Sequence, residues 1–164
     1  MNFSTNAKQK LFSLIDEMNA QPWLFTKSPE TDFTRKKKWS FGDVIKFIIS
    51  MEGQALKDEL LKYFEYKNST PSNSSFNQRR NQILPEAFEF VFHEFTNSFQ
   101  KVDATYKGFS LIACDGSDIY APRNSNDKTT YVQTSPNARG YNLLHLNALY
   151  DLCNRTYIDA IIQA

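Results

Sequence analysis

Residues 112–124 read IACDGSDIYAPRN, in which a short run of small and apolar residues leads into Asp115 and then Asp118. Residues 109–115 have the character of a strand, so Asp115 is predicted at its C-terminal end, on a rigid element and beside a glycine. A carboxylate in that position suits Mg²⁺, which takes one or two carboxylates and fills its other positions with water and phosphate oxygen. The alternative is a plain turn, since Asp-Gly is a common turn dipeptide. Asp118 could support the metal ligand from behind or be a turn residue, and the turn role is favoured.

Two further segments downstream have the patterns of strands. Residues 141–152 alternate, with leucine, alanine and tyrosine on one face and His145, Asn147 and Asp151 on the other. Residues 157–162 are rich in isoleucine and form a third strand. The three strands are therefore predicted to form an antiparallel meander, which needs cover from helices to be stable.

Asp151 and Asp159 are the carboxylates that could join Asp115 around a metal ion. In an up-down-up meander Asp115 lies at the top of the first strand and Asp151 at the bottom of the second, on the order of 25 Å away at about 3.3 Å per residue. Asp159 lies in mid-strand, also below the level of Asp115. We therefore expect these acids not to converge, and a metal site here to have Asp115 as its one ligand.

The histidines and cysteines are expected to have no role in chemistry. His93 and His145 are isolated from other metal-type ligands and are interpreted as structural side chains. Cys114 and Cys153 are interpreted as buried free thiols in a reducing compartment, because their spacing is not that of a metal site.

Residues 1–103 have the hydrophobic spacing of helices. The first helix is predicted to be capped by Ser4 or Thr5 and to end before Pro22, and a capping box from Ser40 to Asp43 starts the second, which Gly53 interrupts. A third helix is predicted over 56–64. The turn-rich segment 68–75 precedes a short helix that reaches Leu84, and Pro85 starts the last helix. The period changes to that of strands after this region. The fold class is thus predicted as α+β, with a helical domain at 1–103 and a second domain at 104–164.

Composition places the chain among foldable proteins. Hydrophobic residues make up 41% of its 164 residues and aromatic residues 15%, which excludes a disordered chain. The segment at the start has no apolar core of signal-peptide length, and residues 47–49, the longest apolar run nearby, are too few to span a bilayer. The chain is expected to be cytosolic, with no membrane partner.

The net charge of +1 conceals a separation of charges along the chain. A basic block next to Trp39 could lie along a phosphate backbone, where each neutralised phosphate adds salt-dependent affinity. The block consists of Arg35, Lys36, Lys37 and Lys38. A solvated connector is the alternative interpretation of such a run.

The short helix after residue 75 is the second candidate for DNA contact. When the helix is projected at about 100° per residue, an outward row of amides suited to base edges or phosphates appears. That row comprises Asn77, Gln78, Asn81 and Gln82, with Arg79 at its flank. Arg80 falls on the side of Phe76, where a guanidinium paired with a carboxylate is the alternative to DNA contact. Three successive helices that end in this one suit a module like a helix-turn-helix.

A polar loop at 119–140 is longer than packing needs, and loops of this kind are often functional. Its cations Arg123, Lys128 and Arg139 are candidates to approach DNA.

Several of these motifs together resemble bacterial insertion-sequence transposases of the DDE type. The more specific segments are ACDGSD at 113–118 and HLNALYD at 145–151. The less specific matches are Phe76, Gln78 and Arg80, then Pro85, Glu86 and Phe88, and YKGF at 106–109. The resemblance spans roughly residues 33–163.

The resemblance implies an RNase H-like catalytic domain whose first catalytic Asp, matched by Asp115, ends the first strand. In this family a second Asp on the fourth strand and a Glu on a later helix complete a site for two Mg²⁺ ions, which serves phosphodiester cleavage and strand transfer in DNA transposition and recombination. The sequence ends before either acid, so we expect a truncated domain without transposition activity and Mg²⁺ only in a complete enzyme. The sheet edge that the next strand would cover is expected to favour poor solubility or association.

The resemblance also implies partners. The helical region is expected to recognise double-stranded DNA at the terminal inverted repeats of the element, in the bacterial cytoplasm and at the nucleoid. Full-length transposase and a second copy of the chain are the candidate protein partners. The alternative is a non-catalytic DNA-binding or regulatory fragment, and a third hypothesis is a helical interaction domain with no nucleic-acid role.

Overall fold

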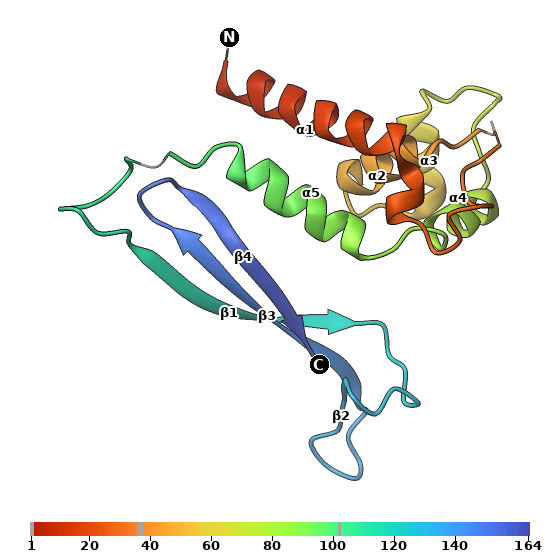
Figure 1. Ribbon diagram of the computed structural model, residues 1–164. Helices are drawn as coiled ribbons and strands as arrows, with labels where there is room; N and C mark the ends of the chain where they lie inside the picture. The colour runs from red at the N-terminus through yellow and green to blue at the C-terminus, as the bar shows by residue number, and fades with distance from the viewer. Residues whose placement is uncertain (1, 36–37, 102) are drawn as a thin grey trace. The chain divides into compact units, whose positions relative to one another are not determined.

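The computed structural model describes residues 2–35, 38–101 and 103–164, and these form an α+β protein (Figure 1). Helices come first along the described chain, and antiparallel strands follow them. The chain divides into two compact units, Met1–Phe95 and Thr96–Ala164, which are called unit 1 and unit 2 below. This division lies close to the predicted boundary between 103 and 104.

The helices begin and end close to the predicted positions. They are α1 (Phe3–Ala20), the short 3-10 helix η1 (Pro22–Phe25), α2 (Phe41–Ser50), α3 (Leu56–Tyr63), α4 (Asn73–Arg80) and α5 (Glu86–Asn97). Within the described residues, no helix combines the length and the apolar character that crossing a membrane requires.

The first helix starts earlier than predicted. Its N-cap is Asn2, whose side chain makes no capping hydrogen bond, while Ser4 and Thr5 lie inside α1. The apolar period that starts at Ala7 gave no sign of this additional turn. Pro22 stops the helix as predicted, because α1 ends at Ala20 and η1 begins at the proline.

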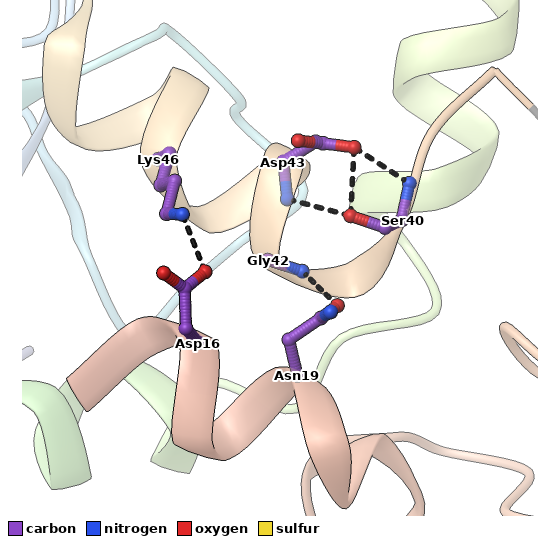
Figure 2. A network of polar contacts seen from close by, with 6 residues as sticks. All are labelled: Asp16, Asn19, Ser40, Gly42, Asp43 and Lys46. Atoms are coloured by element: carbon purple, nitrogen blue, oxygen red, sulfur yellow. Dashed lines mark hydrogen bonds and ion pairs between the residues drawn. The ribbon is translucent and has the colours of Figure 1, made fainter. Parts of the chain in front are cut away.

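The predicted capping box at the start of α2 is confirmed (Figure 2). The amide of Asp43 donates to Oγ of Ser40 over 3.1 Å, and the amide of Ser40 donates to Oδ2 of Asp43 over 3.1 Å. Two links hold this end of α2 on α1: the amide of Gly42 donates to Oδ1 of Asn19, and Lys46 pairs with Asp16 at 2.5 Å. The cap therefore fixes the start of α2, and the two links fix its position on α1.

The hydrophobic core of unit 1 is aromatic. Its largest fully buried side chains are Trp39, Phe41, Phe47 and Phe76, and the ring centroids of Phe47 and Phe76 lie 4.8 Å apart. Burial of each such side chain contributes roughly 1.5–3 kcal/mol to stability. The other buried apolar residues are Ile15, Met18, Val44, Ile45, Leu60, Ile83, Ala87 and Val91. The core thus joins every helix of this unit from α1 to α5.

The fourth helix ends at Arg80, earlier than the predicted end at Leu84. The amides of Gln82 and Ile83 close tight turns on the carbonyls of Arg79 and Arg80. The chain then pairs with the segment after η1, where the amide of Leu84 donates to the Phe25 carbonyl over 2.9 Å. This pairing satisfies backbone groups that a longer helix would have used, so the tertiary contact sets the end of α4.

Unit 2 contains one antiparallel sheet. Its strands are β1 (Ile112–Ala121), β2 (Tyr131–Val132), β3 (Tyr141–Asp151) and β4 (Thr156–Gln163). β3 lies in the middle, with β1 on one side and both β2 and β4 on the other. The predicted meander is therefore observed as β1, β3 and β4, and the two-residue β2 is an addition to it.

The first strand is displaced from its predicted position, which was 109–115. β1 begins at Ile112 and pairs without interruption with β3, from Ile112 opposite Asp151 to Ala121 opposite Asn142. Asp115 thus lies within the strand and not at its end, and Asp118 is a strand residue and not a turn residue. The partner strand decides this, because the long β3 offers backbone hydrogen bonds along the whole of β1.

The apolar core of the described residues lies in unit 1. Every buried hydrophobic side chain among the described residues belongs to that unit, whereas Tyr157, Ile161 and Ile162 on β4 are exposed. The sheet thus presents apolar side chains to solvent, in keeping with the expectation that so small a meander needs cover.

Candidate nucleic-acid interface and the Asp115 face

Aromatic residues on both sides of the predicted basic block contact α4. The guanidinium of Arg79 lies 5.0 Å from the centroid of the Phe33 ring, and the rings of Trp39 and Phe76 lie 5.6 Å apart. Residues 33 and 39 flank the block, so its two ends are fixed against this helix. The structure therefore brings together two predicted DNA-binding regions that are far apart in the sequence.

Within the basic block, the structure describes Arg35 and Lys38, and both are exposed. The predictions for Lys36 and Lys37 fall outside the described residues. The described cations of the block thus remain accessible to a polyanion.

The surface of α4 is polar, as predicted. Ser72 caps the helix by accepting a hydrogen bond from the amide of Ser75 over 3.2 Å. Gln78 and Asn81 are exposed and Asn77 is half-buried, so these amides of the predicted row lie at or near the surface. Gln82 differs, because it is half-buried and its Oε1 accepts a hydrogen bond from Arg79 over 2.9 Å.

Arg79 differs from the projection, which places it at the flank of the amide row, whereas Arg80 lies beside Phe76 as the projection predicts. Arg79 is only 8% exposed and lies between the Phe33 ring and Gln82. Arg80 is exposed, with its guanidinium 5.8 Å from the Phe76 ring. Arg79 is turned inward because Phe33 and Gln82, which lie outside α4, provide contacts for its guanidinium that a projection of the helix alone does not include. Arg80 is therefore the more accessible of the two arginines to a ligand such as DNA, and Arg79 holds α4 against Phe33.

Asp115 lies on an open part of the sheet. It pairs with Ala148 of β3, which in turn pairs with Ala160 of β4, so the row beside the carboxylate contains small side chains. The side chain is exposed, and its Oδ1 accepts a hydrogen bond from the amide of Gly116 over 2.9 Å. This carboxylate is therefore accessible to an external cation or ligand.

The other carboxylates of the sheet lie on its opposite face, because directly paired residues of an antiparallel sheet share a face. Asp118 pairs with His145, Asp151 with Ile112 and Asp159 with Leu149. Each of these pairs lies an odd number of positions along the strands from the pair of Asp115 and Ala148, so its side chains point to the other face. The predicted separation of about 25 Å is wrong, since Ala148 is only three residues from Asp151, or roughly 10 Å along the strand. The expectation that these acids do not converge nevertheless agrees with the geometry.

The described residues do not fit a site for two metal ions. No group of three or more metal-type ligands occurs among them, and Asp115 is the only carboxylate on its face of the paired strands. A site of that kind needs several carboxylates within a few ångströms of both ions. Asp115 remains a candidate ligand for Mg²⁺ that other residues would have to supplement.

An unpredicted pair lies on the face opposite Asp115. Nδ1 of His145 is 3.0 Å from Oδ1 of Asp118, and the imidazole lies over Gly116, where a Cβ would come within 2.8 Å of Nε2. The expectation that His145 is isolated from other metal-type ligands is therefore wrong, although the pair belongs to no group of three such ligands among the described residues. The register of β1 against β3 creates the pair, and that register could not be predicted from the alternation of residues within either strand.

Asp151 has a structural role at the turn between β3 and β4. Its carboxylate accepts hydrogen bonds from the amides of Cys153 and Asn154 and from Nδ2 of Asn154, at 2.8 to 3.0 Å. These bonds, above all those from Asn154, lower the pKa of Asp151 below its ordinary value. Asp151 is thus already occupied in holding the turn.

Both cysteines are free thiols, as predicted, but the expectation that they are buried is wrong. Cys114 is exposed on β1 and Cys153 is half-buried in the β3–β4 turn. Most side chains of the displaced β1 are exposed, and Cys114 is among them.

Comparison with known proteins adds no relative to this description: no protein-family model, curated protein or solved structure matches the chain.

Proposed function

We propose that this chain is the DNA-recognition region and first catalytic strand of a bacterial transposase of the DDE type. In this proposal unit 1 binds double-stranded DNA at the ends of the mobile element, and Asp115 on β1 is one carboxylate of an RNase H-like metal site. The support is the sequence resemblance, the α+β architecture with an antiparallel β1, β3 and β4, and the exposed position of Asp115.

One observation carries the DNA-binding part of the proposal. Phe33 and Trp39, on either side of the basic block, pack against Arg79 and Phe76 of α4. Cations for phosphates and the exposed Gln78 of α4 therefore belong to one region of unit 1. A helix that carries amides beside a cationic segment suits groove contacts with supporting phosphate contacts.

The second candidate function is a non-catalytic DNA-binding or regulatory protein of the same class. The solitary position of Asp115 on its face of the described strands favours it, because one carboxylate holds Mg²⁺ weakly and cannot position two ions. The two candidates agree on DNA binding and differ only in catalysis.

Binding is tested by fluorescence anisotropy with a labelled duplex pool of about 30 random base pairs, roughly three helical turns. We expect affinity that falls steeply with salt. Arg80→Gln should weaken binding several-fold and lower the slope of log K against log salt by about 1, while Lys8→Gln, an equal loss of charge on α1, should change neither. Equal effects of both variants would contradict a role for α4.

Catalysis is tested by a nicking assay with supercoiled plasmid and Mg²⁺. The chain is expected to leave the plasmid intact, as is Asp115→Asn, because the described residues do not complete a metal site. Cleavage that is lost in Asp115→Asn would contradict the non-catalytic alternative and would show that Asp115 works within a complete site.

A further inference from the structure

Asn142, at the start of β3, organises the long loop that follows β1. It is 1% exposed and pairs with Ala121 on one side and Tyr131 on the other. Its Nδ2 donates to the Asn124 carbonyl over 3.0 Å and to Oγ1 of Thr130 over 2.8 Å, and its Oδ1 accepts from the Asn124 amide over 2.6 Å. One buried side chain thus holds both ends of the segment 124–130.

Asp127 extends this network towards the surface. Its carboxylate accepts hydrogen bonds from the hydroxyl groups of Thr129 and Thr130, at 2.6 and 2.7 Å. These bonds, that of Thr129 first, lower the pKa of Asp127 below its ordinary value. A loop that served only as a connection would not need a buried polar network, since each buried polar group is costly unless it is bonded. The network indicates that the loop must hold one shape.

The shape held by the network places two cations around one aromatic ring. The guanidinium of Arg123 lies 5.9 Å from the centroid of the Tyr131 ring, and Nζ of Lys128 lies 5.6 Å from it. Backbone contacts fix both cations, because Arg123 Nε donates to the Gly140 carbonyl over 3.1 Å and Lys128 Nζ donates to the Ser125 carbonyl over 2.7 Å. Gly140 is required here, since a Cβ at that position would overlap the Tyr131 ring.

The loop has an excess of positive charge. Residues 122–140 contain three cations, Arg123, Lys128 and Arg139, and a single carboxylate, Asp127. The carboxylate of Asp127 faces threonine hydroxyls, and within the described residues none of the three cations is paired with an acid. Cations that are held in place beside an aromatic ring and are not paired with an acid suit contact with a nucleic-acid backbone.

We propose that Arg123 and Lys128, held around Tyr131 by the Asn142 network, form a second contact with the phosphate backbone of duplex DNA, separate from α4. This inference rests on the proposed function and adds a DNA contact in unit 2. The two cations bind phosphates, and Tyr131 acts as the platform that keeps them in place. The contact carries no base specificity, because phosphate contacts position a protein on DNA without reading its sequence.

The test measures DNA affinity of the full chain with the same random duplex pool over a range of salt concentrations. The double variant Arg123→Gln/Lys128→Gln is expected to weaken binding by about tenfold or more and to lower the salt slope by about 2, one for each lost phosphate contact. The matched control is Arg155→Gln, an exposed cation at the β3–β4 turn, the far end of β3 from Gly140, and it should bind as the parent does. Equal far-UV circular dichroism spectra of all variants check that the fold is retained.

The outcomes separate this inference from the proposed function. If Arg80→Gln weakens binding but the double variant behaves like Arg155→Gln, the loop contact is wrong and the proposed function stands. If the double variant weakens binding and Arg80→Gln does not, the loop contact stands and the role of α4 is wrong. If the parent chain binds no duplex DNA at low salt, both are wrong.

Discussion

Asp115 and Asp151 lie on opposite faces of one sheet, although only three positions of β3 separate Asp151 from Ala148, the partner of Asp115. Asp151 accepts three hydrogen bonds that close a turn, whereas Asp115 is exposed beside small side chains. The two carboxylates therefore have different tasks: Asp151 stabilises the sheet, and Asp115 is open to an external ligand.

The stability of unit 2 should depend on the charge of Asp151 in acid. Its pKa is lowered in the folded state, so its contribution is present above the unfolded value of about 3.9 and is lost as the pH falls through the lower, folded value. We expect Asp151→Asn to be less stable than the parent at neutral pH and to lose less stability on acidification. Urea unfolding, followed by heteronuclear NMR signals of β3, measures both effects.

The control for this prediction is Asp103→Asn, an exposed acid of the same unit. Asp103→Asn should lose as much stability on acidification as the parent does. If Asp151→Asn also loses as much as the parent, the turn is held by contacts other than this carboxylate.

Ser40 and Ser4 provide a matched pair for the capping box. Ser40→Ala removes the N-cap of α2 and should lower the free energy of unfolding of unit 1 by about 1 kcal/mol. Ser4→Ala lies inside α1, where alanine is the better helix former, and should be neutral or slightly stabilising. Urea titrations followed by tryptophan fluorescence report on this unit, since Trp23 and Trp39 both belong to it. If Ser4→Ala lowers the free energy of unfolding more than Ser40→Ala does, Ser4 is the N-cap of α1, as the sequence predicts.

Gly116 and His145 should be energetically coupled. Alanine at position 116 would gain roughly 0.5–1 kcal/mol in a strand, but its Cβ would displace the imidazole that bonds to Asp118. We therefore expect Gly116→Ala to be neutral or destabilising in the parent and stabilising in a His145→Ala background. A double-mutant cycle based on amide hydrogen exchange of β3 should give a coupling of at least about 0.5 kcal/mol. Additive effects would mean that the ring does not lie over Gly116.

The Asn142 network should govern order in the loop. Asn142→Ala leaves the Asn124 amide and the Thr130 hydroxyl without their buried partner and should cost about 2 kcal/mol. Amides of residues 124–131 should then exchange faster with solvent. Asn137→Ala, at an exposed position of the same loop, should leave exchange unchanged. If both variants behave alike, the loop does not depend on Asn142.

Elements with strong local signals could be predicted from the sequence. The capping box at Ser40 is confirmed because both of its partners are in the local sequence. The predicted strand over 141–152 is observed as Tyr141–Asp151, since its alternation of apolar and polar residues matches a pleated strand. The same alternation placed His145 and Asp151 on one face, as the pairing has it.

Features set by partners distant in sequence could not be predicted. The bounds of β1 depend on how far β3 extends alongside it, and this decides whether Asp115 ends a strand or lies within one. The orientation of Arg79 depends on Phe33, which lies far from it in the sequence. The sequence pattern predicts Asn142 as an ordinary outward residue of a strand. Its burial depends on the loop, whose residue Asn124 accepts a hydrogen bond from it.

The central claim is that α4 presents amides that read DNA, and selection from a random duplex pool followed by sequencing tests it most directly. The parent chain is predicted to enrich one motif, and the Gln78→Ala/Asn81→Ala variant is predicted to lose or change that motif while retaining salt-dependent binding. No enrichment by the parent chain, or the same motif in both selections, would contradict the claim.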